Sequence, residues 1–143
     1  MKVVYYSYYG CYSSSICAYL HLNDKSKIEK EEFLKIPFLF QVDYGQMRFI
    51  GKDNNQNEVF IIGTKNFSEN IKKTLYDLME VFKIKEDIIF IDTSHYDVIF
   101  FKVLMNLRGK KILTQTIDNF LYNYYLMRHK NIKRFVERYK KIL

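Results

Sequence analysis

A serine-rich loop behind a predicted strand is the first stretch of this chain that could do chemistry. Residues 2–9, KVVYYSYY, are typical of a buried strand, and they are followed by Gly10, Cys11, Tyr12, Ser13, Ser14 and Ser15. A helix that starts here would offer free N–H groups and a partial positive charge to a phosphate, sulfate or carboxylate. We therefore expect a small anionic or phosphorylated ligand at this strand-helix loop. The alternative is a tight turn in which Ser13 or Ser14 only caps the helix.

Two well-defined chemistries fit this loop poorly. A Walker A loop needs more glycine and a lysine before its Ser or Thr, whereas this loop has one glycine and no lysine. A phosphatase loop of the Cys-x5-Arg type would start at Cys11 and need arginine at position 17, where the chain has Cys17. The sequence therefore leaves open whether the protein is an enzyme.

A second group of candidate residues follows the apolar run DIIFIDT at 87–93. If this strand end belongs to a site, Asp92 would be its metal ligand or base, and His95 could transfer protons near neutral pH. The alternative is that Asp92 ends a buried strand and that Thr93 or Ser94 caps the helix after it. We expect no metal site, because His21 and His129 add no ligand at a suitable spacing and Cys11 and Cys17 supply no partner pattern for zinc. The sequence indicates no particular cofactor.

The elements that position these residues alternate between strand and helix patterns. Strands are predicted at 2–9, 47–53, 57–63, 87–93 and 118–127, and helices at 13–22, 26–36, 66–82, 96–107 and 128–141. The turn residues at 53–57 favour an antiparallel hairpin. We therefore predict a single domain over 1–143, an αβα sandwich of three layers with a mainly parallel sheet of about five strands. In such sheets ligands bind at the carboxyl ends of the strands, where strand order reverses.

Charge and composition limit the remaining classes. The net charge is +7, and residues 128–143 carry seven basic residues against one acid, so six of the seven net charges lie there. We interpret this face as solvated, with nucleic-acid binding through Arg128, Lys130, Lys133 and Arg134 as an alternative. No apolar run approaches the roughly 18 residues of a membrane span. Two cysteines without a disulfide pattern indicate a reducing, cytoplasmic location.

Aromatic content supports a further alternative. The chain has 13 tyrosines and 12 phenylalanines. If some of them form a surface patch, the protein is an interaction or regulatory module that binds a protein partner without catalysis.

Three blocks give the chain a family resemblance. DYGQMRFIGKD at 43–53, NEVFIIGTKN at 57–66 and IIFIDT at 88–93 resemble, in order and spacing, a family of uncharacterised bacterial proteins called domain of unknown function 3189. The resemblance covers residues 2–96. It implies an α/β fold and a site at the first loop, but no established activity.

The first loop departs from the pattern of that family. Its loop tends to read Cys-Tyr-Gly-Gly-x-His-Ser-Ser, which places its Cys on Ser7, its first Gly on Tyr9 and its His on Tyr12. The positions that match are Gly10, Ser13 and Ser14, together with Asp43, Tyr44, Gly45 and Arg48 of the second block. The resemblance therefore implies that Arg48 could hold a carboxylate or phosphate near the serines. Its alternative is an ion pair with Asp43.

Overall fold

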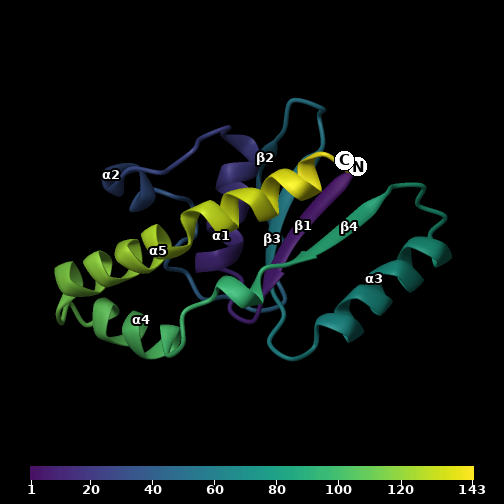
Figure 1. The fold of residues 1–143 in the computed structure, drawn as a ribbon. Helices are drawn as coiled ribbons and strands as arrows, with labels where there is room; N and C mark the ends of the chain where they lie inside the picture. Colours follow the sequence, from purple (N-terminus) through teal and green to yellow (C-terminus); the bar gives the residue numbers. More distant parts are fainter.

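The computed structural model describes residues 1–143 as four strands, five α-helices and one 3-10 turn. In chain order these are β1 (Lys2–Ser7), α1 (Tyr12–Leu22), α2 (Lys30–Phe33), β2 (Arg48–Lys52), β3 (Glu58–Gly63), α3 (Ser68–Val81), β4 (Ile88–Asp92), η1 (Ser94–Tyr96), α4 (Phe101–Gly109) and α5 (Thr114–Lys140). Figure 1 shows α5 crossing the molecule beside α1, whereas α3 stands apart from both, next to β4.

The four strands form one mixed sheet in the order β2-β3-β1-β4. Strand β1 pairs in parallel with β3 and β4, and β2 pairs antiparallel with β3. The predicted hairpin and the α/β class are confirmed. The sheet has four strands rather than about five, because residues 118–127 are not a strand.

Those residues lie inside α5, which runs without a break from Thr114 to Lys140. The aromatic run LYNYYL suggested a strand, since Tyr and Phe favour sheets. The buried positions nevertheless recur at helical spacing, at Ile117, Leu121, Tyr125, Ile132 and Val136. Periodicity therefore outweighs composition over this segment.

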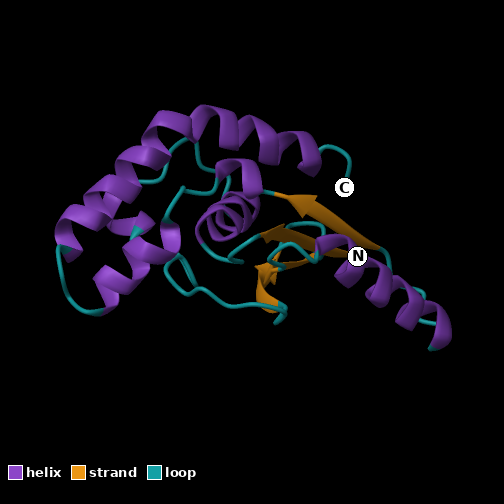
Figure 2. Cartoon of the chain, turned by 90° about the horizontal axis from the view of Figure 1, so that it is seen from below, coloured by secondary structure: helices purple, strands orange, loops and turns teal.

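The main core lies between one face of the sheet, here called the first face, and helices α1 and α5. It contains 23 buried residues, among them Val3 and Tyr5 of β1. Several tyrosines also bond across this core: Tyr12 Oη donates to the Leu121 carbonyl at 2.6 Å, and Tyr125 Oη accepts the Ile28 N–H at 3.0 Å. Figure 2 shows α1 and α5 on one side of the strands, away from α3. Part of the aromatic content is therefore structural.

The opposite face of the sheet, here called the second face, has a small core. Val4, Tyr6 and Ile62 are its buried residues, and Ile71 of α3 packs against them. Helix α3 lies where its apolar periodicity predicted a helix, yet none of its 14 residues is buried. Helix α3 therefore covers this face only loosely. The predicted arrangement of three packed layers is not established.

The segment after β4 also differs from the prediction. Residues 96–107 were expected to form one largely buried helix, but the chain makes the short turn η1 and starts α4 only at Phe101. Within α4 only Phe101 is buried. This delay leaves Asp97 in an irregular segment beside the start of α1. None of the helices combines the length and apolar character that crossing a membrane requires.

Candidate functional site

The loop after β1 is held in place by two glycines. Gly10 has a φ of +64°, and its N–H donates to Ser7 Oγ at 3.1 Å. A Cβ atom on Gly10 would lie 2.1 Å from the backbone nitrogen of Gly63, at the end of β3. The loop therefore packs backbone against backbone at the carboxyl ends of β1 and β3, and only glycine fits at position 10.

The three serines of the first loop are buried and belong to α1 rather than capping it. Ser13 Oγ and Ser14 Oγ lie 3.1 and 3.0 Å from Thr93 Oγ1, which donates to the Tyr6 carbonyl at 3.0 Å. The N-cap residue is Cys11, and no side chain caps the helix. The expectation of capping by Ser13 or Ser14 is wrong, as is that of capping by Thr93 or Ser94, since η1 has no side-chain cap either. These hydroxyls join α1 to the end of β4.

Asp97 completes this buried polar group. Neither of its carboxylate oxygens is accessible to solvent, and neither has a hydrogen-bond partner. Burial raises the pKa of Asp97 to about 6, although the nearby hydroxyls of Ser13 and Ser7 and the Ser13 N–H act to lower it. We call Ser7, Ser13, Ser14, Thr93 and Asp97 the polar centre. A buried carboxyl with a shifted pKa, at the carboxyl ends of β1 and β4, is typical of a functional site.

Sequence reasoning missed Asp97 because 96–107 was read as a continuous helix. One signal was available: Asp97 is the single acidic residue between Asp92 and Asp118. An isolated acid before the apolar run VIFF is a poor fit to a buried helix.

Of the other first-loop residues, Cys11 and Ser15 are both fully enclosed. Burial raises the pKa of the Cys11 thiol to about 12, so it is protonated at neutral pH and a weak nucleophile. Ser15 Oγ is buried without a hydrogen-bond partner. Both Cys11 and Cys17 are free thiols.

The segment Asp43–Gly45 fills the crevice between the ends of β1 and β3. The Asp43 N–H donates to the Tyr9 carbonyl at 3.3 Å, and the Gly45 N–H donates to the Gly63 carbonyl at 2.8 Å. A Cβ on Gly63 would lie 2.0 Å from the Asp43 carbonyl oxygen. The chain itself therefore fills the carboxyl edge of the sheet between β1 and β3.

Arg48 is paired within this segment rather than aimed at the serines. Its Nη2 lies 2.8 Å from Asp43 Oδ2, its Nη1 donates to the Gln41 carbonyl at 3.3 Å, and its guanidinium lies 4.8 Å from the ring centroid of Phe38. Tyr44 receives Lys65 Nζ over its ring at 4.4 Å. The ion-pair alternative for Arg48 and Asp43 is therefore the arrangement observed.

Asp92 and His95 lie near the polar centre but are exposed. Asp92 Oδ1 accepts the Ser94 N–H at 2.9 Å, which closes the turn after β4. The His95 carbonyl accepts a hydrogen bond from Arg128 Nη1 at 3.0 Å, and the ring rests edge-on against Tyr96. No group of three His, Cys, Asp or Glu residues lies close enough to hold a metal ion. A role for either residue in a ligand site stays a prediction.

The basic residues of α5 divide into paired and free ones. Arg128 lies over the Tyr124 ring, and Lys133 Nζ lies 3.3 Å from Glu137 Oε1. Lys130 and Arg134 are exposed, and Arg134 lines a shallow hollow of about 300 Å³ with Tyr96, Asn131, Phe135 and Arg138. Nucleic-acid binding through this helix stays a prediction.

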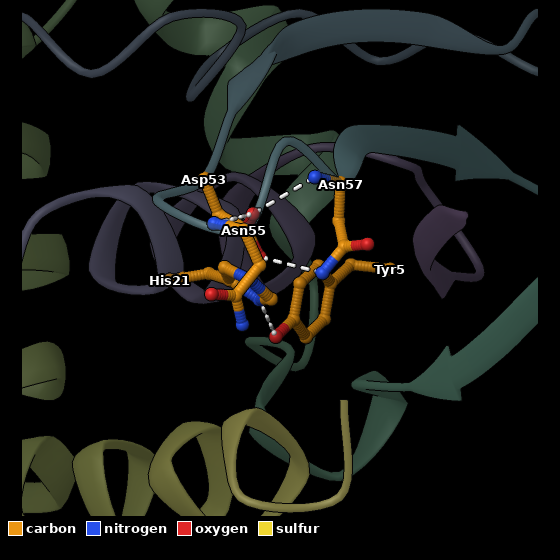
Figure 3. A network of polar contacts seen from close by, with 5 residues as sticks. All are labelled: Tyr5, His21, Asp53, Asn55 and Asn57. Carbon is orange, nitrogen blue, oxygen red and sulfur yellow. Dashed lines mark hydrogen bonds and ion pairs between the residues drawn. The ribbon is translucent and has the colours of Figure 1, made fainter.

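A second polar network, shown in Figure 3, joins α1 to the β2–β3 hairpin. His21 is buried; its Nδ1 lies 2.8 Å from Tyr5 Oη and its Nε2 lies 3.1 Å from Asp53 Oδ2. Burial lowers the pKa of His21 against the opposing effect of Asp53, so we assign a neutral ring that donates from Nε2 and accepts at Nδ1. Asp53 also accepts the N–H groups of Asn55 and Asn57. Every member is satisfied, which indicates a structural role.

Removing the acceptor of this network should be costly. We expect Asp53→Ala to lower the free energy of unfolding by about 2–3 kcal/mol, because a buried imidazole and the hairpin N–H groups lose their acceptor. Urea unfolding followed by circular dichroism measures the change. The exposed Asp24→Ala is the control, and an equal effect of both substitutions would contradict a fastening role for Asp53.

The fold and site together define an α/β protein with a mixed four-stranded sheet and a buried polar centre at its carboxyl edge. The chain belongs to a family of proteins of unknown function, DUF3189, whose model matches residues 2–141. The predicted resemblance is confirmed, and it extends beyond residue 96 to nearly the whole chain. No curated protein and no solved structure matched it.

Proposed function

We propose that this protein binds a small anionic or phosphorylated ligand at the start of α1, beside the polar centre. The observation that carries the proposal is the start of α1, where no side chain caps the first N–H groups and the Asp97 carboxylate lies buried without a hydrogen-bond partner. Such a group lowers stability at neutral pH. Groups of this kind concentrate at functional sites.

The start of α1 favours a negatively charged oxygen. The first helical N–H with a backbone acceptor is that of Ser15, which bonds to the Cys11 carbonyl at 2.9 Å. The N–H groups of the preceding turn have no intrahelical acceptor, and no side chain caps them. Asp97 lies beside this position, and the Ser13 N–H acts to lower its pKa. The start of α1 therefore favours a negatively charged oxygen.

Asp97 also makes this binding depend on pH. At pH 7 its carboxylate repels an incoming anion. Below the pKa of about 6 the carboxyl is neutral and becomes a hydrogen-bond donor. Anion affinity should therefore rise as the pH falls from 7.5 to 5.

Thermal shift and calorimetry with inorganic phosphate, sulfate, sugar phosphates and nucleotides test the proposal at pH 5.5 and pH 7.5. We expect at least one anion to bind roughly tenfold more tightly at pH 5.5 than at pH 7.5. A change of one unit in the pKa of Asp97 on binding corresponds to about a tenfold change in affinity. Asp97→Asn should bind that anion at both pH values, whereas the exposed Asp24→Asn should behave as the natural chain does. If no anion raises the melting temperature of Asp97→Asn at either pH, the proposal is wrong.

A further inference from the structure

Helix α3 has an apolar surface that its own chain does not cover. Leu78, Val81, Phe82 and Ile84, at and just after its C-terminal end, are 46%, 72%, 68% and 48% exposed. We call these four residues the α3 patch. An amphipathic helix is stabilised mainly by burial of its apolar face, so a helix of 14 residues with none buried needs a partner surface.

The second face of the sheet leaves a matching surface open. Helix α3 lies over the part of this face next to β4, where Ile71 packs against the cluster of Val4, Tyr6 and Ile62 and the Tyr76 ring lies 6.0 Å from that of Phe90. On the half formed by β2 and β3, Phe49 of β2 packs against Phe60 of β3 with ring centroids 5.4 Å apart and stays 51% exposed. An unfilled helix position therefore lies over β2 and β3, next to α3.

Charge favours a second copy of this chain as the occupant. Residues 65–87 contain five lysines and five acidic residues, so this segment is neutral within a chain of net charge +7. Two copies repel each other least where they meet through this segment. The opposite side of the molecule carries the excess of basic residues on α5.

We propose that the protein forms a two-fold symmetric dimer through the α3 patch and the uncovered β2–β3 half of the second face. A two-fold axis parallel to the strands, between α3 and this half, places each α3 over the partner's β2 and β3. The same surfaces then meet twice, as in an isologous interface. The α3 patch and Phe49 expose on the order of 500 Å² per copy, more than half of the roughly 800 Å² per partner of a standard interface.

Sedimentation velocity and light scattering of the full chain over a range of micromolar concentrations test the proposal. We expect twice the chain mass for the natural protein, and a dissociation constant at least 100-fold weaker for Phe82→Glu and for Phe49→Glu. Both side chains are more than half exposed, so both variants should fold, which circular dichroism checks. Met127→Glu, at a position 83% exposed on α5, is the matched control and should remain dimeric.

Three results would overturn the dimer: a monomeric natural chain at the highest concentration, dimers of unchanged affinity in both glutamate variants, or equal dissociation of the Met127→Glu control. Because anion binding is measured at the polar centre on a different part of the fold, its failure and the failure of dimerisation are separate results.

Discussion

Gly10→Ala should prevent the chain from reaching its native fold or lower its free energy of unfolding by more than about 4 kcal/mol. The new Cβ would lie 2.1 Å from the Gly63 nitrogen and 2.4 Å from its Cα, both backbone atoms in the end of a paired strand. The φ of +64° adds conformational strain of about 1 kcal/mol. Strand β3 would have to move, and with it the pairing on which the sheet depends. Circular dichroism and urea unfolding measure the outcome.

Substitutions at two other glycines distinguish the effect of steric overlap from the effect of lost backbone flexibility. Gly63→Ala should be comparably damaging, because its Cβ would lie 2.0 Å from the Asp43 carbonyl oxygen. Gly109→Ala, at the end of α4 with no atom within 4 Å of the new Cβ, should be neutral or stabilising by up to about 1 kcal/mol. If all three alanine variants lose the same free energy of unfolding, close packing of the first loop is not the cause of the loss.

The second large effect is a gain of stability. Asp97→Asn should raise the free energy of unfolding at pH 7 by about 2 kcal/mol, because it removes a buried charge that lacks a partner. The pKa of Asp97 is raised from 3.8 to about 6, so the folded chain binds a proton more readily than the unfolded chain does. Its contribution to stability is therefore present below pH 4 and is lost as the pH rises through 6.

The difference between Asp97→Asn and the natural chain should accordingly grow between pH 4 and pH 6.5 and then level off. His21 acts in the opposite direction, since its pKa is lowered in the folded chain, but it is present in both proteins and cancels in the difference. Chemical denaturation at a series of pH values measures this profile. A difference that does not change with pH would show that Asp97 is not buried as a carboxyl.

The patterns of apolar residues and the turn residues predicted most of the strands and helices. The apolar run of β1, the DNNQN turn and the run IIFID each predicted the correct element in nearly the correct place. The prediction was wrong at 118–127, where Tyr122 and Tyr124 of α5 donate hydrogen bonds to the distant carbonyls of Ile28 and Asp97, and the segment resembles a strand in composition. The composition of this segment favours a strand, whereas the helical spacing of its buried positions favours a helix.

The candidate site was predicted less completely, for a similar reason. Ser13 and Ser14 were correctly placed at the end of the first strand, but their partner Thr93 is some 80 residues away. Asp97 and the pairing of His21 with Asp53 depend on the same long-range folding. Residue types indicated the serine loop, whereas burial and lack of a partner, which distinguish Asp97, are properties of the folded chain.

The segment Asp43–Gly45 in the crevice between β1 and β3 also determines which ligands can compete there. A segment tethered at both ends acts as an intramolecular ligand, with an effective concentration in the range of about 1 mM or above. A free molecule present at micromolar levels would need an intrinsic affinity about a thousandfold higher than that of the segment to displace half of it. Soluble metabolites at ordinary concentrations will therefore find this crevice occupied by the chain itself.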